Sequence, residues 1–251
     1  MPSSAPSFSA VRDALQPISG WLTDTQAERL FEAARRVPTA GRIVEIGSFQ
    51  GRSTVALALG ASEMTGPLVA IDPHAGNDRG PQEIAGYGAE AAADHDVFHA
   101  NLETAGVADR VRHVRQYSSA ALEEAAGPID LLYIDGAHRF GPARADIVEW
   151  GAHVVPGGSL LIHDTFSSVG VTAALLVTLL PGDRFRYVGR SGSLSEYRAE
   201  RLTPPERVRN ALHQLAQLPW FARNLLIKAL IVAKARPLAR LVGHDGETWP
   251  Y

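Results

Sequence analysis

The sequence predicts an α/β protein built on a mostly parallel sheet whose last strand is antiparallel. Short apolar runs rich in β-branched residues alternate with helical stretches between about residues 40 and 180, which is the pattern of βαβ units. Several of these runs end in an acidic residue or a histidine, and in open parallel sheets ligands bind beyond the carboxyl ends of the strands. A chain of 251 residues is long enough for one such domain with additions.

The elements are expected in the following order. Residues 8–37 carry the pattern of two helices, the second beginning at Thr23 or Asp24 and ending before Pro38. The expected strands are 42–47, 68–72, 111–116, 129–135 and 158–164. The expected helices between and after them are 51–60, 84–104, 119–126, 140–152 and 169–180. An antiparallel hairpin at the sheet edge is expected from 184–190 and 193–199. The chain therefore divides into an N-terminal helical cap (1–40), a central domain (41–200) and a C-terminal helical extension (201–251).

Composition excludes several classes of function. The absence of cysteine excludes disulfides, thiolate chemistry and cysteine-bound metals. The N-terminal MPSSAPSFSA lacks the basic and apolar regions of a secretory signal, and no run reaches the ~18 apolar residues of a membrane span. We therefore expect a cytoplasmic protein without a transmembrane segment. Residues 1–200 have a net charge of −8, counted from the sequence, so nucleic-acid binding is not expected.

The C-terminal extension differs from the rest of the chain. Residues 201–251 have a net charge of +5 and contain both lysines of the protein. Three arrangements are open for its apolar helices: packing on their own domain, packing on a partner subunit in a homodimer, or lying on a membrane surface. The apolar residues do not form one clean stripe, which favours the first two.

The stretch VEIGSFQGRST (44–54) is a strand, a glycine-bearing turn and a helix start. Gly47 and Gly51 allow the backbone to approach a ligand closely, and the helix start offers free N–H groups to an anion. Its glycine spacing differs from the dinucleotide fingerprint GxGxxG. An ordinary turn without a ligand is the alternative.

Four of the predicted strands carry an acidic residue at or near their carboxyl end: Glu45, Asp72, Asp135 and Asp164, the last preceded by His163. A single aspartate at such a place is often a helix cap. Four acids on one edge of one sheet favour a shared site.

Together, E-x-G-x-x-x-G, Asp72, "YIDGAH" and "LLIHD" resemble class I S-adenosylmethionine-dependent methyltransferases, whose sheet is Rossmann-like, over roughly residues 40–200. They are most similar to a metal-dependent branch with macrolide-sugar O-methyltransferases, cephalosporin methyltransferase/hydroxylase proteins and the 1-O-methyltransferase of methylmannose polysaccharide synthesis. The resemblance implies S-adenosylmethionine as cofactor. Glu45, Gly47 and Ser53 would then line its methionine end, and Asp72 would accept from its ribose hydroxyls. Gln116 and Ser118 would border the adenine, and Asp135 would lie between cofactor and metal.

Asp135 and Asp164 are expected on adjacent strand ends, where two carboxylates repel each other or recruit a cation. Oxygen ligands favour Mg²⁺ or a similar hard ion, and the resemblance also implies a metal here. The branch has an acidic pair where this chain has His163-Asp164. His163 could add a nitrogen ligand, favouring Mn²⁺, or orient a water. A metal-free, salt-bridged or capping pair is the alternative.

His138 stands three residues beyond Asp135, and the resemblance implies that it is the general base. An alcohol with a pKa of about 15 is unreactive at neutral pH, but a metal lowers that pKa and an imidazole can take the proton. A solvent-facing histidine at a helix start is the alternative. His74 is a candidate contact of substrate or cofactor. The remaining histidines, among them His95, His99 and His113, are expected to be structural or on the surface.

Residues 73–88, rich in glycine and proline, are expected to form a lid over the cofactor, with Arg79, Tyr87 and Arg139 as candidate substrate contacts. The sequence thus predicts an O-methyltransferase acting on a sugar-like hydroxyl of a small molecule or oligosaccharide. Three alternatives remain: an accessory protein that binds S-adenosylmethionine without methylating, a methyltransferase of another natural product, and a membrane-surface interaction protein.

Overall fold

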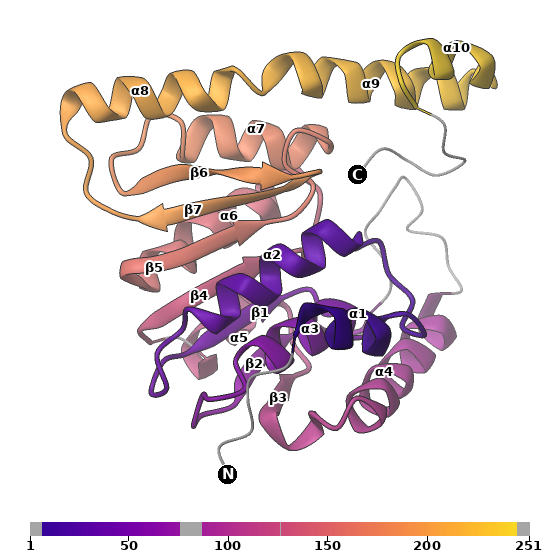
Figure 1. Ribbon diagram of the computed structural model, residues 1–251, viewed down its shortest axis with the longest axis vertical. Coiled ribbons are helices and arrows are strands. Elements are labelled where there is room, and N and C mark those ends of the chain that lie inside the picture. The colour runs from indigo at the N-terminus through magenta and orange to yellow at the C-terminus, as the bar shows by residue number, and fades with distance from the viewer. Residues whose placement is uncertain (1–6, 76–86, 126, 245–251) are drawn as a thin grey trace.

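A computed structural model describes residues 7–75, 87–125 and 127–244 of the chain. Its centre is a seven-stranded sheet in the order β3-β2-β1-β4-β5-β7-β6 (Figure 1). The strands are β1 (Ile43–Ile46), β2 (Leu68–Ile71), β3 (Val111–Val114), β4 (Ile129–Ile134), β5 (Val154–Ile162), β6 (Phe185–Ser191) and β7 (Leu194–Ala199). The first five strands pair in parallel, and β7 runs antiparallel to both of its neighbours. The expected fold class is confirmed.

Helices cover both faces of the sheet and make three layers (Figure 1). The helices are α1 (Phe8–Leu15), α2 (Asp24–Arg35), α3 (Arg52–Gly60), α4 (Tyr87–Thr104), α5 (Ser118–Ala125), α6 (Phe140–Glu149), α7 (Val169–Thr178), α8 (Pro204–Leu215), α9 (Leu218–Val232) and α10 (Arg236–Leu241). One hydrophobic core joins α1 to α4 with the sheet, and a second joins α5 to α7 with its other face. Because β1, β2 and β4 are covered on both sides, their sequences are nearly all apolar.

The sheet order reverses direction at β1, which has β2 on one side and β4 on the other. The chain leaves these two neighbours toward opposite faces, so a crevice opens at the carboxyl end of β1. Asp72, Asp135 and Asp164 follow β2, β4 and β5 within two residues. The polar strand ends expected from the sequence therefore lie in the loops beside this crevice.

Strand β5 begins at Val154, four residues earlier than expected. Its pairing with β4 jumps from Ile129↔Val154 to Leu131↔Ser159, so the intervening residues bulge out of the ladder. The sequence Pro156-Gly157-Gly158 that suggested a strand start marks this bulge instead. Helix α4 begins at Tyr87. Most of the expected lid, 76–86 with Arg79, lies outside the described residues.

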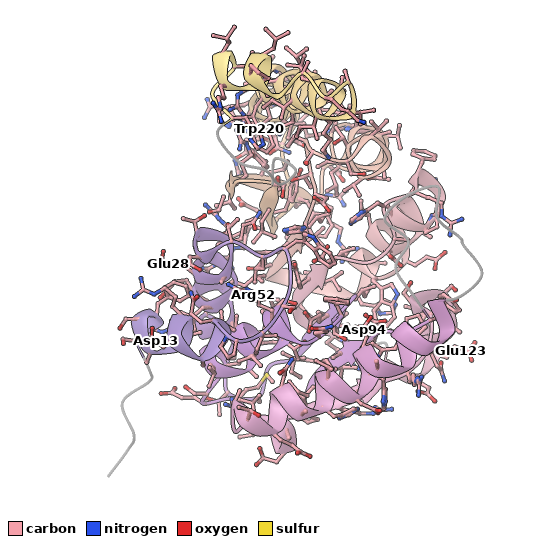
Figure 2. The ribbon with its side chains drawn as sticks, turned by 90° about the vertical axis from the view of Figure 1, so that its right-hand side faces the viewer. Asp13, Glu28, Arg52, Asp94, Glu123 and Trp220 are labelled. Atoms are coloured by element: carbon pink, nitrogen blue, oxygen red, sulfur yellow. The ribbon has the colours of Figure 1, made fainter. Side chains whose placement is uncertain are left out.

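The C-terminal helices pack on their own domain, as Figure 1 shows for α8 and α9 beside α7 and the β6-β7 hairpin. The amide of Asn210 on α8 accepts from the backbone N–H of Tyr187 at 2.7 Å and donates to the carbonyl of Phe185 at 3.0 Å. This side chain therefore bonds with the exposed edge of β6 as a further strand would. Trp220 of α9, labelled in Figure 2, stacks with the Arg190 guanidinium, whose central carbon lies 3.8 Å from the ring centroid.

Pro204–Val232 is long and apolar enough to cross a membrane by length and composition. A single helix of this kind is weak evidence for a span. Its buried polar residues Asn210, Gln214 and Asn224 bond with the protein's own backbone or side chains. In the described residues, these helices thus pack on their own domain. Val208, Leu212 and Leu226 remain exposed.

Candidate active site

The loop between β1 and α3, residues 47–51 and here called the first loop, packs against the end of β4. Gly47 has a φ of +85°, and a Cβ at this position would lie 2.2 Å from the Asp135 carbonyl oxygen. No other residue fits there without moving the backbone. Gly51, with a φ of +90°, is the N-cap of α3. The glycine spacing thus places the first loop directly beside Asp135.

Asp72 holds the first loop in place. Its carboxylate accepts hydrogen bonds from the backbone N–H groups of Ser48 and Phe49, both at 2.9 Å, and of His74 at 2.8 Å. Phe49 and His74 both have a positive φ, +45° and +43°, a strained conformation that surrounding contacts must maintain. A carboxylate offers about four acceptor positions, so one remains for a ligand hydroxyl.

Glu45 is fully buried beneath the start of α3. It accepts from the hydroxyls of Ser53 and Thr54, both at 2.5 Å. Burial raises the pKa of Glu45 to about 8, although these two hydrogen bonds act in the opposite direction. Glu45 and Ser53, expected to line the methionine end of the cofactor, therefore bond to each other.

Other polar groups near the crevice have different surroundings. The hydroxyl of Ser118, expected near the adenine, donates to Asp146 of α6 at 2.5 Å. Gln116 is half-buried just beyond β3. The hydroxyl oxygen of Ser48 is buried, and no described residue forms a hydrogen bond with it. Ser48 therefore leaves a polar atom in the first loop for a ligand, which the sequence alone did not indicate.

Four side chains beyond β4 and β5 form what we call the acid–histidine cluster: Asp135, His138, His163 and Asp164. The His138 Nε2 lies 2.8 Å from the Asp164 Oδ2 and 3.9 Å from the Asp135 Oδ1. The His163 Nδ1 lies 3.3 Å from the same Asp135 oxygen and 3.5 Å from the same Asp164 oxygen. The two strand-end aspartates are thus brought together as expected, with a histidine on either side.

The backbone around His138 is fixed by the start of α7. The hydroxyl of Ser168 donates to the His138 carbonyl at 3.3 Å. A Cβ on Gly170 would lie 2.2 Å from that same oxygen, so only glycine allows α7 to approach this closely. The side chain of His138 is 19% exposed, whereas that of His163 is 1% exposed. Of the two imidazoles, that of His138 is therefore the one partly open to solvent.

Charge couples the two histidines to the two aspartates. Burial alone would lower the pKa of each imidazole, but the carboxylates of Asp135 and Asp164 outweigh it and raise the pKa of His138 to about 9 and of His163 to about 10. Burial acts to raise the pKa of Asp164, yet the charge of His163 and the contact with His138 hold it well below the usual range. Without a cation the cluster therefore balances two carboxylates with two imidazolium groups.

The same groups fit a divalent cation. One ligand atom each from Asp135, His138 and Asp164 lie within 4.8 Å of one another, and two hard carboxylate oxygens suit Mg²⁺ or Mn²⁺. The sequence expectation had grouped His163 with the aspartates, whereas this triad contains His138. His163 has both ring nitrogens buried, and its Nε2 forms no hydrogen bond with any described residue. The His163 Nδ1 faces the same two carboxylate oxygens as the His138 Nε2 does.

The loop that carries Asp164 is held by the C-terminal extension. Asp164 and Phe166 have positive φ values of +56° and +55°. Asn224 of α9 donates to the Phe166 carbonyl at 3.1 Å, and Lys228 donates to the Ser167 carbonyl at 2.8 Å. Sequence reasoning missed both residues, because nothing local links a residue of the extension to a loop about 60 positions earlier.

A comparison with known protein families identifies the part of the chain that contains these residues. Residues 44–165, which contain the first loop and the acid–histidine cluster, match the family model described as "Methyltransferase domain". This segment is a methyltransferase domain. The match begins in β1 and ends just after Asp164, so it spans the strand ends that build the crevice.

Solved structures with the same fold include proteins described as methyltransferases. The cofactor-bound Rv0187 from MTB is 23% identical with a TM-score of 0.54, and the match covers 78% of this chain and 88% of that one. An O-methyltransferase from Bacillus cereus in complex with SAH is 18% identical with a TM-score of 0.53, covering 78% and 93%. TomG from Streptomyces achromogenes, in complex with SAM, is 18% identical with a TM-score of 0.51, covering 80% and 91%. The methyltransferase domain therefore has the class I methyltransferase fold expected from its motifs.

Proposed function

We propose that this protein is an S-adenosylmethionine-dependent O-methyltransferase that methylates a hydroxyl of a sugar or glycoside. The observation that carries the proposal is the contact between Gly47 of the first loop and the backbone of Asp135. It puts the loop suited to a cofactor and the acid–histidine cluster side by side at one edge of the sheet.

The first loop and Asp72 would hold S-adenosylmethionine, which supplies a methyl group activated on a sulfonium. The fourth acceptor position of the Asp72 carboxylate suits a ribose hydroxyl. The Ser48 hydroxyl, which has no hydrogen-bond partner among the described residues, and the start of α3 suit the polar methionyl end. Glu45 and Ser53 would act by shaping that helix start. Structures of the same fold bound to SAM or SAH support this choice of cofactor.

Asp135 and Asp164 would hold Mg²⁺ or Mn²⁺, which lowers the pKa of a nearby hydroxyl when bound. His138 is the group placed to accept the hydroxyl proton, because it is the partly exposed imidazole of the cluster. His163 is buried against the same carboxylates and would fix their positions or supply a further ligand. The single net proton transfer is from the acceptor hydroxyl to His138.

The acceptor class rests on the resemblance of "YIDGAH" and "LLIHD" to sugar-methylating enzymes. Within that class, 1-O-methylation of a methylmannoside in polysaccharide synthesis is the narrowest form of the proposal. A cytoplasmic location and a homodimer formed through the C-terminal helices are part of the same proposal. An accessory protein that binds S-adenosylmethionine without methylating remains the second candidate, because it would use the same first loop and Asp72.

Release of S-adenosylhomocysteine across a panel of sugars, glycosides and phenolic acceptors tests the function. We expect turnover with a sugar or glycoside, loss of turnover in EDTA, and recovery with added Mg²⁺ or Mn²⁺. Asp135→Asn should bind the cofactor but lose the response to metal, while Asp130→Asn, outside the site beside Arg42, serves as the control. Full turnover in chelator would remove the metal from the proposal. Cofactor binding with no turnover on any acceptor would favour the accessory protein.

A further inference from the structure

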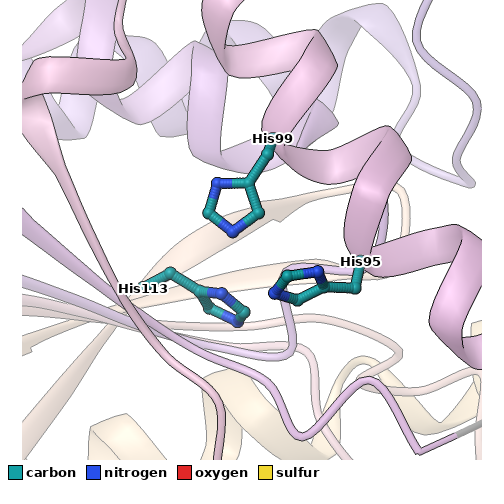
Figure 3. Close-up of side chains that lie close together, drawn as sticks. All are labelled: His95, His99 and His113. Atoms are coloured by element: carbon teal, nitrogen blue, oxygen red, sulfur yellow. The ribbon is translucent and has the colours of Figure 1, made fainter.

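A second cluster of potential metal ligands lies outside the acid–histidine cluster. Figure 3 shows His95 and His99 on α4 and His113 on β3, with ring nitrogens of all three turned toward a common point. One nitrogen from each ring lies within 4.8 Å of the others. We call these residues the trihistidine cluster.

Local structure explains why the three rings converge. His95 and His99 are four residues apart on α4 and so share one face of the helix. Between them, Phe98 is fully buried and packs against both His99 and His113, with ring centroids 5.2 Å and 4.9 Å apart. This anchor presses α4 onto the sheet and brings the histidine face of the helix over β3.

Hydrogen bonds hold two of the rings in the orientation that is usual for histidine ligands of a metal. The His113 Nε2 lies 3.2 Å from the backbone carbonyl of Asp72. A carbonyl only accepts, so Nε2 carries the proton and Nδ1 keeps its lone pair. The His95 Nδ1 faces the Asp96 carboxylate at 3.4 Å, which leaves Nε2 for a ligand. Metal-binding histidines typically donate their second nitrogen to a carbonyl or carboxylate in this way.

The charge state of the cluster also suits a metal. Burial lowers the pKa of His113 to about 4, and the neighbouring histidines act in the same direction. Burial and the nearby rings of His95 and His74 lower the pKa of His99 as well. Both imidazoles are therefore neutral near pH 7, which is the form that binds metal.

We propose that His95, His99 and His113 bind a divalent transition-metal ion of the Zn²⁺ type, at a site separate from the acid–histidine cluster. Three imidazole nitrogens favour Zn²⁺, Cu²⁺ or Ni²⁺ over Mg²⁺, whereas the carboxylates of Asp135 and Asp164 have the opposite preference. Tetrahedral zinc with bonds of ~2.0–2.1 Å holds neighbouring nitrogens about 3.3 Å apart. The three nitrogens, within 4.8 Å of one another, would have to approach by up to ~1.5 Å to reach that spacing. His95 and His113 are half-buried and not fully enclosed.

The ion would connect α4 to β3 and, through His113, to Asp72. Asp72 in turn holds the first loop by two backbone hydrogen bonds, from the N–H groups of Ser48 and Phe49. Zn²⁺ would therefore stabilise the fold on the side of the sheet that carries the first loop. This inference does not depend on the proposed O-methyltransferase activity.

Calorimetric titration of the full-length protein with Zn²⁺ tests the proposal. We expect the parent and Asp135→Asn to share a Zn²⁺ site, and His99→Gln to weaken that site at least ~100-fold, since even second-shell changes cost 10–100-fold. His213→Gln, which changes an exposed histidine of α8, should bind as the parent does. Undiminished zinc binding in His99→Gln, or loss of all zinc binding in Asp135→Asn, would overturn the proposal.

A second readout guards against misfolding of the variant. Zn²⁺ should raise the melting temperature of the parent and of His213→Gln but not of His99→Gln, whose melting temperature without metal should match the parent's. If His99→Gln melts lower without metal, the imidazole NMR signals of the parent decide the matter. A zinc-induced shift of the His95, His99 and His113 signals supports the site, and unchanged signals refute it.

Discussion

At the residue scale, the Nε2 atom of His138 can serve either of two roles. Its Nε2 lies 2.8 Å from the Asp164 Oδ2, where it can either bind a cation shared with the aspartates or exchange a proton with an acceptor. The carboxylates raise its pKa to about 9 against the effect of burial. Below that pH the imidazole is protonated and cannot be a base, unless a bound cation offsets the carboxylate charge.

His138→Ala separates the two roles. If the residue is the base, kcat should fall by ~10²–10⁴, the usual contribution of general-base catalysis, while the Mg²⁺ concentration for half-maximal activity stays within a few-fold. The rising limb of the parent's pH–rate profile should vanish in the variant. A large loss of Mg²⁺ activation with the limb intact would make His138 a metal ligand instead. His153→Ala, on the turn before β5, is the matched control.

At the element scale, the first loop depends on Asp72, the residue directly after β2. Three backbone N–H groups donate to Asp72, and the loop residues Phe49 and Gly51 both have positive φ. Arg52, labelled in Figure 2, ties the same region to the N-terminal helices by donating to the carbonyls of Leu15 and Ile18, both at 2.9 Å. The contacts of Asp72 and of Arg52 therefore both help to fix the shape of the first loop.

Asp72→Ala should weaken S-adenosylmethionine binding by roughly 1.5–3 kcal/mol, the loss expected for hydrogen bonds to a charged group. Because the backbone N–H groups of Ser48 and Phe49 in the loop, and that of His74, also lose their acceptor, the melting temperature without cofactor should fall. Calorimetry and thermal unfolding measure the two effects. Asp72→Asn keeps one acceptor oxygen and should lie between parent and Ala. Unaltered affinity in Asp72→Ala would remove this residue from the cofactor site.

At the scale of the whole molecule, the C-terminal extension reaches from the sheet edge to the acid–histidine cluster. Asn210 bonds with β6, and Asn224 and Lys228 bond with the strained loop that carries Asp164. Burial lowers the pKa of Lys228 and the charge of Asp164 opposes this, so the ammonium group and that carboxylate influence each other. The extension is thus part of the site's support.

Asn224→Ala should reduce Mg²⁺-activated turnover and lower the melting temperature, because the buried Phe166 carbonyl loses its partner at a cost of ~1–3 kcal/mol. Leu226→Ala changes an exposed side chain of the same helix and should leave metal activation unchanged. Metal titration of activity in both variants checks the expectation. The reverse result, with Leu226→Ala affecting turnover and Asn224→Ala not, would mean that the extension acts through its exposed face, as in a dimer.

Local sequence determined the elements and the strand-end acids of this protein. The alternation of apolar runs and helices predicted the sheet, and Asp72, Asp135 and Asp164 were placed at strand ends where the structure has them. The reason is that strand periodicity, helix caps and glycine turns depend on neighbours within a few residues. The predicted start of β5 was wrong, because the bulge in this strand depends on its pairing with β4.

Tertiary structure alone decided which side chains meet. That His138 joins Asp164 more closely than His163 does, that Asp72 holds the first loop, and that Lys228 lies beside the Asp164 loop all depend on chain segments packed from afar. The trihistidine cluster is the clearest case, since its members were expected to be structural or surface histidines. His95 and His99 share a helix face by local geometry, but only the packing of Phe98 on the sheet brings His113 to them.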